Sequence, residues 1–145
     1  MKKQIANWQQ RIKNLELVYE PYPQEKLLIA MPNPHPDRSY EVETESSEFT
    51  SLCPLHPGQP DFAKITIRYT PDKHIVEFKS LKFYLTSYRM VEIYYEDATN
   101  RILTDLVATV KPKKMEIIAE WTVRGGISTI VRATYNGKGV PNKRQ

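Results

Sequence analysis

Residues 62–88 read FAKITIRYTPDKHIVEFKSLKFYLTSY, and the spacing of the apolar side chains changes within this stretch. In the first part, apolar residues occupy every second position, which is the period of a strand: Ile65, Ile67 and Tyr69. Pro71-Asp72-Lys73 predicts a turn, after which residues 74–78 can return as the second strand of a hairpin. In the last part, apolar residues recur at every third or fourth position, which predicts a helix: Leu81, Tyr84, Leu85 and Tyr88.

Downstream of this stretch the sequence predicts a second helix and two further strands. The helix covers residues 97–110 and ends before Pro112, and its apolar face consists of Ile102, Leu103, Leu106, Val107 and Val110. Residues 115–123 and 127–135 alternate again as strands, on the two sides of Gly125-Gly126. The order strand, strand, helix, helix, strand, strand predicts an α+β fold, in which an antiparallel sheet carries both helices on one face.

The first 60 residues are less regular. Helical spacing near the N-terminus predicts a short amphipathic helix through Ile5, Trp8, Ile12 and Leu15. Eight of the eleven prolines lie between Pro21 and Pro60. We therefore expect little regular structure in that stretch, apart from a short edge strand at residues 27–31 and a loop at residues 33–38.

The chain divides into three parts: an N-terminal helix and proline-rich arm (1–32), one domain (33–135) and a basic tail (136–145). A length of 145 residues, with 40% hydrophobic and 26% charged residues, suits one domain with its own core. The net charge is +4, and three of these charges lie in the tail, on Lys138, Lys143 and Arg144. The rest of the chain is nearly neutral, which does not favour a nucleic-acid-binding protein.

The sequence favours residence in the cytoplasm and no membrane association. No apolar run approaches the roughly 20 residues of a membrane span, and the first residues do not form an apolar signal core. The single cysteine, Cys53, excludes an internal disulfide and a cysteine-based zinc cluster. The three histidines are scattered, so no metal site is expected. The glycine motifs of P-loop and Rossmann nucleotide sites are absent.

The predicted sheet has two free edges, and such edges are usually covered or closed in natural proteins. Subunits joined edge to edge in a ring would close both edges. We therefore expect a homo-oligomer of ring type, and a monomer in solution would contradict this expectation.

The lone Cys53 is the first candidate for chemistry. Three prolines and one glycine follow it within eight residues, which predicts a rigid, irregular loop of the kind that carries functional residues. Lone cysteines are mostly small buried hydrophobes, so the alternative that Cys53 only packs in the core stays open. A thiolate nucleophile needs a partner that moves protons. Asp61 lies at the far end of the loop, and a carboxylic acid in an apolar wall beside Phe62 can stay protonated and donate one.

The second candidate is the strand-to-helix junction over residues 77–84. Lys79 and Lys82 project from neighbouring turns of the predicted helix, and Arg89 lies on the same side. A helix start carries free N–H groups and a positive dipole, which suit a phosphate. The alternative is a solvated helical face.

Two further acidic and basic residues stand out. Glu96 lies at the start of the second helix, where a buried carboxylate could accept paired N–H donors from a guanine-like base. Its neighbour Asp97 is explained by helix capping alone. Arg124, which precedes Gly125-Gly126, is the other candidate for a functional residue. The alternative is that this segment is only a strand bulge with an arginine on the surface.

Four segments taken together resemble the nitrile reductases of queuosine biosynthesis, the 7-cyano-7-deazaguanine reductases, in their short single-domain form: residues 48–62, 77–84, 96–103 and 124–128. The cysteine loop of that family resembles Phe49-Thr50-Ser51-Leu52-Cys53-Pro54, followed by Gly58-Gln59-Pro60-Asp61-Phe62. Its signature, Glu-x-Lys-Ser-x-Lys-x-aromatic, is met by Glu77, Lys79, Ser80, Lys82 and Tyr84. The match spans residues 33–135.

This resemblance implies the tunnelling fold, which is shared with GTP cyclohydrolase. Subunits of that fold assemble into rings, here pentameric rings that can pair into a decamer, with active sites between subunits. The implied reaction is the four-electron reduction of a nitrile to a primary amine with two NADPH as co-substrates and no metal.

The resemblance also implies a role for each matching residue. Cys53 would attack the nitrile carbon and form a covalent thioimide, and Asp61 would protonate the nitrogen. The substrate-binding residues would be Val76, Glu77, Phe78, Tyr95 and Glu96. The NADPH-binding residues would be Lys79, Ser80, Lys82 and, as a phosphate contact, Arg124.

The chain departs from the family pattern at two places. His56-Pro57 occupies a place where the family often has one residue, so the loop between Cys53 and Asp61 must bulge. Many members have His-Glu where this chain has Tyr95-Glu96, so a proton-transfer task of that histidine would fall here to Tyr95, to a water or to His56.

Two other functions are weighed against reduction. Related archaeal proteins keep the cysteine and the acid but add ammonia to the nitrile-bearing base within tRNA. They lack the Lys-Ser-x-Lys motif, whose presence here favours reduction. The second alternative is a non-catalytic tunnelling-fold protein that binds a purine, and the pair of Cys53 and Asp61 counts against it.

Overall fold

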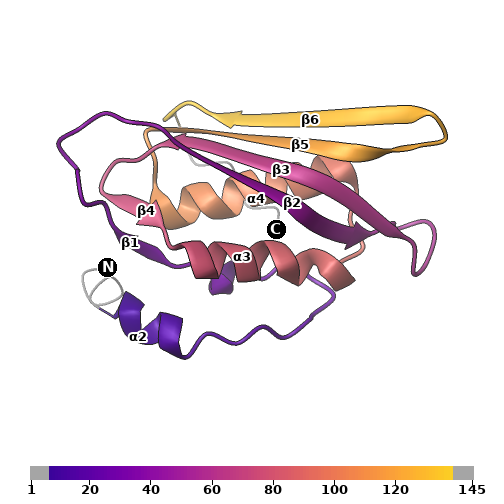
Figure 1. The fold of residues 1–145 in the computed structure, drawn as a ribbon, viewed down its shortest axis with the longest axis horizontal. Coiled ribbons are helices and arrows are strands. Elements are labelled where there is room, and N and C mark those ends of the chain that lie inside the picture. Colours follow the sequence, from indigo (N-terminus) through magenta and orange to yellow (C-terminus); the bar gives the residue numbers. More distant parts are fainter. Residues whose placement is uncertain (1–6, 139–145) are drawn as a thin grey trace.

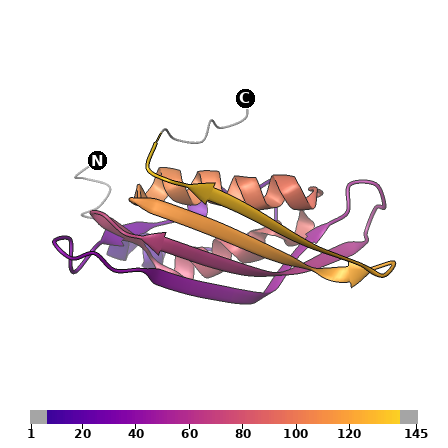
Figure 2. The same cartoon turned by 90° about the horizontal axis from the view of Figure 1, so that it is seen from above.

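The computed structural model describes residues 7–138 as a twisted antiparallel sheet with helices on one side (Figures 1 and 2). Ile5 of the predicted N-terminal helix, and Lys143 and Arg144 of the predicted tail, lie outside the described residues. The elements, in chain order, are α2 (Trp8–Lys13), η1 (Glu25–Leu27), β1 (Ala30–Pro32), β2 (Val42–Leu52), β3 (Pro60–Thr70), β4 (His74–Val76), α3 (Phe78–Thr86), η2 (Ser87–Met90), α4 (Tyr95–Val110), β5 (Lys114–Arg124) and β6 (Ile127–Tyr135).

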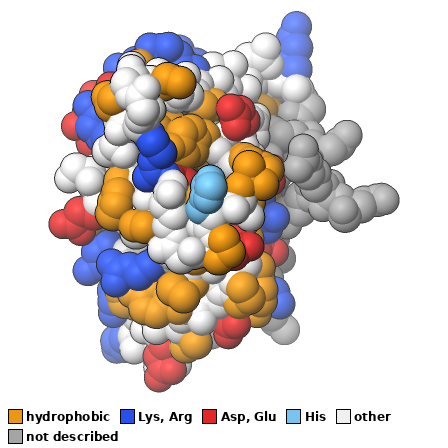
Figure 3. Space-filling model, turned by 90° about the vertical axis from the view of Figure 1, so that its right-hand side faces the viewer, with side chains coloured by type: hydrophobic (Ala, Val, Ile, Leu, Met, Phe, Trp, Pro, Cys, Tyr) orange, Lys and Arg blue, Asp and Glu red, His pale blue; other side chains and the backbone are white. Residues whose placement is uncertain are grey.

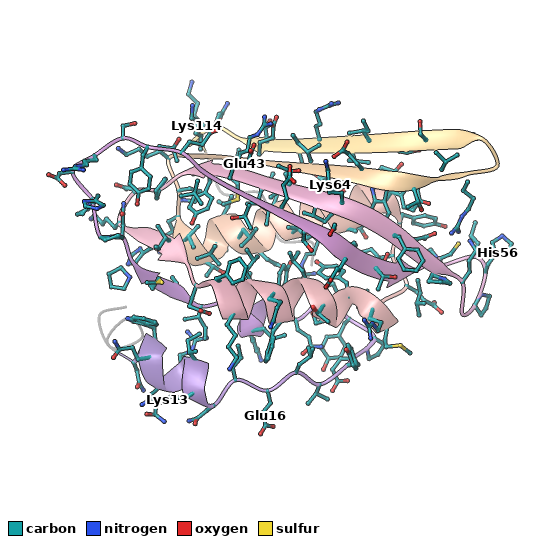
Figure 4. The ribbon with its side chains drawn as sticks, viewed as in Figure 1. Lys13, Glu16, Glu43, His56, Lys64 and Lys114 are labelled. Atoms are coloured by element: carbon teal, nitrogen blue, oxygen red, sulfur yellow. The ribbon has the colours of Figure 1, made fainter. Side chains whose placement is uncertain are left out.

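The main sheet has the strand order β2-β3-β5-β6, and every pair in it is antiparallel. Figure 2 shows α3 and α4 together on one face of this sheet. The opposite face is charged: Lys64 Nζ lies 3.0 Å from Glu120 Oε2, and Figure 4 shows Lys64 and Glu43 on this outer side. An antiparallel sheet with one buried face and both helices on that face confirms the predicted fold class.

The prediction of the first hairpin is wrong. Residues 60–70 pair with β2, and His74–Val76 pairs instead with Ala30–Pro32 as a separate two-stranded sheet. Strand β2 was missed because it reads VETESSEFTSL, and only Phe49 and Ser51 of these residues are buried. A strand at the edge of a sheet needs few apolar residues, so its sequence carries no clear apolar alternation.

The predicted short strand at residues 27–31 is displaced. Leu27 belongs to the 3-10 turn η1, and the strand begins at Ala30. The predicted loop at residues 33–38 is confirmed as irregular backbone.

Both predicted helices are confirmed, and their apolar faces form the core against the sheet. The buried positions on α3, η2 and α4 include Leu81, Tyr84, Leu85, Tyr88, Ile102, Leu103, Leu106, Val107 and Val110. Helix α4 begins two residues earlier than predicted, at Tyr95. It ends at Lys111, which adopts a left-handed φ of 49°, and Pro112 then prevents its continuation. None of the helices in the described part of the chain is long and apolar enough to cross a membrane.

A buried polar network joins α3, η2 and α4. Asp105 is 1% exposed, and it accepts a hydrogen bond from Tyr84 Oη at 2.7 Å and from Arg101 Nε at 3.0 Å. The hydroxyl groups of Tyr84 and Tyr88 lie 2.9 Å apart. Arg101 Nη2 also binds Glu25 Oε2 at 3.1 Å, which ties the proline-rich arm to α4.

We expect Tyr84 and Tyr88 to stay protonated in the folded protein at pH values where exposed tyrosines ionise. Burial raises the pKa of both hydroxyl groups above the value of about 10 in an unfolded chain. Between the pKa of the unfolded chain and the higher pKa of the folded protein, only the unfolded chain releases these protons. The stability that the two tyrosines contribute is therefore fully present below the unfolded pKa and is lost as the pH rises through the folded pKa. Tyrosinate absorbance at high pH measures this. The Tyr88→Phe variant should show the same absorbance as the parent while folded, and a decrease would contradict the prediction.

Candidate active site

Cys53 lies at the end of the hairpin formed by β2 and β3. The strands pair up to Leu52 and Pro60, and the N–H of Cys53 donates to the carbonyl of Gln59 at 2.9 Å. The following loop contains a turn in which the N–H of Gln59 donates to the carbonyl of His56 at 3.0 Å and Gly58 has a φ of +80°. Cys53 is therefore held in place by the paired strand ends, as a half-buried free thiol. Figure 4 shows His56 at the outer end of this loop, directed away from the sheet, which makes it a poor proton donor to the site.

Asp61 lies one residue inside β3, directly opposite Ser51 of β2. It is 3% exposed. Its Oδ1 atom lies 2.8 Å from Nη1 of Arg124, and Tyr95 donates to the same oxygen over 3.4 Å. Three strands and the start of α4 thus bring one carboxyl, one guanidinium and one phenol to the end of the sheet where Cys53 lies.

The expected apolar wall beside Asp61 is not formed by Phe62. Successive side chains of a strand point to opposite faces, so Phe62 lies on the outer face and is 47% exposed. The wall consists instead of Tyr95, whose ring stacks on Trp121 with centroids 4.0 Å apart and planes 8° apart. Burial, followed by the negative charge of Asp61, raises the pKa of Tyr95. Tyr95 is therefore a neutral donor at physiological pH.

Two buried polar atoms near Asp61 have no hydrogen-bond partner within residues 7–138: Ser51 Oγ and Trp121 Nε1. Ser51 is fully buried opposite Asp61, and Trp121 is 4% exposed beneath Tyr95. Such groups are rare in folded proteins and often mark the place of a ligand or a water. Sequence reasoning missed both: the strand that carries Ser51 was not predicted, and the stacking of Trp121 on Tyr95 is a contact between β5 and α4 that the sequence pattern does not reveal.

The start of α3 does not offer free N–H groups to a phosphate, which corrects that expectation. The carboxylate of Glu77 accepts from the N–H of Lys79 at 2.9 Å and from that of Ser80 at 2.6 Å. Ser80 is fully buried, and its hydroxyl donates to the Glu77 carbonyl at 2.8 Å and accepts from Ile29 N at 3.1 Å. The placement of Ser80 argues for a role in joining β1 to α3 rather than for a direct cofactor contact.

The lysine side chains at this junction remain available for an anion. Lys79 Nζ and Lys82 Nζ lie 5.5 and 5.7 Å from the ring centroid of Phe83. Neither lysine forms a salt bridge with another described residue. Lys82 also lines a groove of about 210 Å³ between β2 and α3, together with the exposed Phe78. Two unpaired ammonium groups on one helical face fit a phosphate group.

Glu96 is exposed, so the prediction that its carboxylate is buried is wrong for the single subunit. It lies in the first turn of α4 and lines a groove of about 850 Å³. The other wall of this groove is the proline-rich arm at residues 21–25. The groove leaves room for a ligand or a neighbouring subunit against Glu96.

One subunit does not bring all the predicted site residues together. Cys53, Asp61, Tyr95 and Arg124 lie at one end of the sheet, where the β2–β3 and β5–β6 hairpins turn (Figure 1). Residues 76–79 lie at the opposite end, where β4 leads into α3, and Lys82 lies halfway along α3. The two motifs can meet only if residues from different copies of the chain share a site.

We expect Tyr95→Phe to impair substrate binding or turnover, because Tyr95 Oη is a neutral donor to the Asp61 carboxyl. The ring would remain stacked on Trp121, so the fold should be unchanged. A loss of one such hydrogen bond to a charged group corresponds to a decrease of about 10-fold in kcat/KM. Unchanged kinetics would remove Tyr95 from the site, and Tyr19→Phe, at an exposed tyrosine outside the groove beside Glu96, is the matched control.

The chain is similar to known proteins over most of its length. The sequence model of one protein family, described as QueF-like protein, matches residues 60–139. A protein of Thermomicrobium roseum named NADPH-dependent 7-cyano-7-deazaguanine reductase is 56% identical over 76% of this chain and 85% of its own length. A protein of the same name from Chloroherpeton thalassium is 50% identical over 78% of this chain and 97% of its own length.

A solved structure shows the same fold. The archaeosine synthase QueF-Like, in its apo form, superposes with a TM-score of 0.58 over 71% of this chain and 96% of its own. Its sequence is 24% identical, so this likeness concerns the fold alone.

Proposed function

Because the chain belongs to the QueF-like protein family, we propose that it is an NADPH-dependent 7-cyano-7-deazaguanine reductase that serves queuosine modification of tRNA. It would reduce the nitrile of 7-cyano-7-deazaguanine to the aminomethyl group. The observation that carries this function is the placement of the lone Cys53 and the buried Asp61 at the same end of two paired strands. A thiol without a disulfide partner and a reaction driven by NADPH both suit the reducing cytoplasm.

The first step would be the attack of the Cys53 sulfur on the nitrile carbon. The S–C bond forms, one C–N π bond breaks, and the nitrogen takes a proton from Asp61, which gives a thioimide. A nitrile carbon is a mild electrophile, and a soft thiolate suits it. Covalent attachment divides a difficult reduction into easier steps and holds the carbon in place.

NADPH, when bound, supplies one hydride for each of the two reductions. The chain's own part would be to bind its phosphate through Lys79 and Lys82, whose ammonium groups are unpaired in the described subunit. Cys53 would hold the carbon through the first reduction and leave as a thiol when the imine forms. No metal ligand set is needed for these roles.

The deazaguanine ring would be held by Glu96, whose carboxylate can accept two parallel N–H bonds from the amidine edge of the base. Val76, Glu77 and Phe78 would complete the substrate pocket from a neighbouring subunit. This sharing is supported by the separation of the two motifs in one subunit and by the open groove beside Glu96.

A ring of the tunnelling-fold type would provide that neighbour. The end of the molecule that carries the Cys53 loop exposes many hydrophobic side chains (Figure 3). The exposed hydrophobic residues of the segments at this end include Leu55, Phe62, Met90, Tyr94, Val123 and Ile127. Strands β2 and β6 are the outer strands of the sheet in the described residues, and β2 is covered only at Leu52, which pairs with residues 91–93. Apolar surface next to free edges favours burial against a second copy of the chain.

We expect the double variant Lys79→Ala/Lys82→Ala to raise the KM for NADPH. A hydrogen bond to a charged group contributes about 1.5–3 kcal/mol, so each lysine should account for about 10-fold or more. The KM for the nitrile substrate should change little. Lys13→Ala, on the exposed outer side of α2 (Figure 4), is the matched control. An unchanged KM for NADPH would show that these lysines only cover a solvated helical face.

The experiment that tests the function is a stoichiometric assay. Purified protein is mixed with 7-cyano-7-deazaguanine and NADPH, and both NADPH absorbance and product mass are followed. We expect two NADPH oxidised per nitrile consumed and a product with the mass of the primary amine. Unchanged NADPH in this assay, together with ammonia-dependent consumption of the nitrile on tRNA that carries the base, would instead favour the amidine-forming alternative.

A further inference from the structure

Arg124 has an unexpected partner. The resemblance assigns it to the NADPH phosphate, but its Nη1 atom lies 2.8 Å from Oδ1 of Asp61, and its Nη2 atom donates to the carbonyl of Pro60 at 3.0 Å. We propose that Arg124 is a positioning residue for Asp61: it holds the carboxylate through Oδ1 and leaves Oδ2 to carry the proton from Cys53 to the nitrile nitrogen. This inference rests on the proposed function and names a further residue of the same site.

The backbone is shaped to direct Arg124 to this carboxyl. Strand β5 has a bulge between Trp121 and Arg124, where the register with β6 shifts by one residue. Without the bulge, Arg124 would point to the outer face, three residues after the inward-facing Trp121. The extra residue returns Arg124 to the inner face, where Asp61 lies. Gly125 and Gly126, with φ of 58° and 76°, then close the hairpin in a turn that suits glycine.

The two oxygens of Asp61 are in different surroundings. Arg124 and Tyr95 both bind Oδ1. Among the described residues, no hydrogen bond reaches Oδ2, and Asp61 is only 3% exposed. The neighbouring Ser51 Oγ, opposite Asp61, is also without a partner in this part of the chain. Oδ2 is not one of the fully buried atoms that lack a partner, so the small exposed part of Asp61 leaves this oxygen open to a group that enters the site, which is the arrangement expected for an atom that exchanges a proton with the reacting group.

The charges around Asp61 support a proton relay. The groups that face it are Arg124 from β5, Tyr95 from α4 and Ser51 from β2, and Cys53 comes directly after the end of β2. A guanidinium forms an ion pair with the carboxylate form of an acid, so Asp61 would begin the reaction as a carboxylate. This differs from the prediction of a protonated Asp61 in an apolar wall.

The relay balances without another reactant. Oδ2 takes the proton of the Cys53 thiol as the sulfur forms its bond to the nitrile carbon. One C–N π bond breaks, and the nitrogen takes the same proton from Oδ2. The net reaction adds S–H across the nitrile, Asp61 returns to the carboxylate, and no oxidant or reductant is consumed.

Formation of the thioimide needs no NADPH. Its rate therefore reports on Arg124 as a positioning residue for Asp61, and not on Arg124 as a contact of the NADPH phosphate. The rate of adduct formation on Cys53 is measured by intact mass after mixing the protein with 7-cyano-7-deazaguanine alone. We expect Arg124→Ala to slow this step by about 100-fold, since a small misplacement of a catalytic group has an effect of that size. Arg124→Lys can bind either the Asp61 carboxylate or the Pro60 carbonyl but not both, so its rate of adduct formation should be intermediate. Added guanidinium ion should partly restore the rate of Arg124→Ala. Arg38→Ala, at an exposed arginine in a loop, is the matched control.

A double-variant comparison distinguishes positioning from a general effect on the fold. In an Asp61→Asn background, Arg124→Ala should cause little further loss, because the two residues act through one atom. Adduct formation at the parent rate in Arg124→Ala, with only the KM for NADPH raised, would overturn the inference and leave Arg124 as a phosphate contact. Additive losses would overturn it as well. Failure of the parent protein to form any adduct would instead overturn the proposed function itself.

Discussion

Replacing Cys53 with alanine is expected to lower the steady-state rate of NADPH-dependent nitrile reduction by about 10⁴-fold or more. The thiol would be the only nucleophile of the reaction, and loss of a nucleophile removes the covalent route altogether. The measurement is NADPH oxidation in the presence of saturating 7-cyano-7-deazaguanine. The side chain is half-buried at a strand end and its sulfur forms no disulfide, so the variant should fold normally.

A Cys53→Ser variant serves as the second comparison. Serine keeps the size of the side chain but supplies a much weaker nucleophile at neutral pH, so it should be nearly as inactive as alanine. Thermal unfolding of both variants should match that of the parent within a few degrees. Reduction at a tenth of the parent rate or faster in either variant would contradict a covalent role of Cys53.

Replacing Asp61 with asparagine has the second largest expected effect. Proton transfer by a positioned side chain contributes about 10²–10⁴-fold, so adduct formation without NADPH should slow by a factor in that range. Asparagine has nearly the same shape and can still accept from Arg124 and Tyr95, but it cannot take a proton from the thiol. The measurement is the rate of appearance of the protein–substrate adduct by intact mass.

The control for this variant is Asp37→Asn, which changes an exposed aspartate in the loop before β2. It should leave the rate of adduct formation unchanged. If Asp61→Asn forms the adduct as fast as the parent, the proton comes from another source, and neither the role of Asp61 nor the positioning role of Arg124 can be correct.

Most of the core could be predicted from the sequence because apolar periodicity is strong where an element is buried. Strands β3 and β5 and helices α3 and α4 lie in the middle of the fold, and their inward positions carry Ile, Leu, Val and Tyr side chains. Strand β2 was missed because it lies at the sheet edge and its inward face is mostly polar. That omission also led to the wrong partner for residues 74–76.

The site could be predicted in part. The pair of Cys53 and Asp61 was identified from the chemistry of the loop, and the structure places both at one end of the β2–β3 hairpin. The partner of Arg124 could not be predicted, because its direction depends on a bulge that a sequence pattern does not reveal. The capping role of Glu77 and the burial of Ser80 depend equally on local geometry.

The remaining site residues are not brought together within a single subunit. Glu96 lines an open groove, and the β4–α3 junction that carries Lys79 lies at the other end of the sheet from the β2–β3 hairpin turn (Figure 1). Their meeting depends on how copies of the chain assemble, and contacts between copies leave little trace in one subunit beyond exposed apolar residues and free strand edges.

The central claim is that Cys53 forms a covalent thioimide that is then reduced. The most direct test is to record the intact mass of the protein with 7-cyano-7-deazaguanine alone, and again after NADPH is added. The proposed function predicts a gain equal to the mass of one substrate per chain, absent in Cys53→Ala, and its discharge to the amine by NADPH. An adduct that NADPH leaves unchanged, or no adduct at saturating substrate, would contradict it.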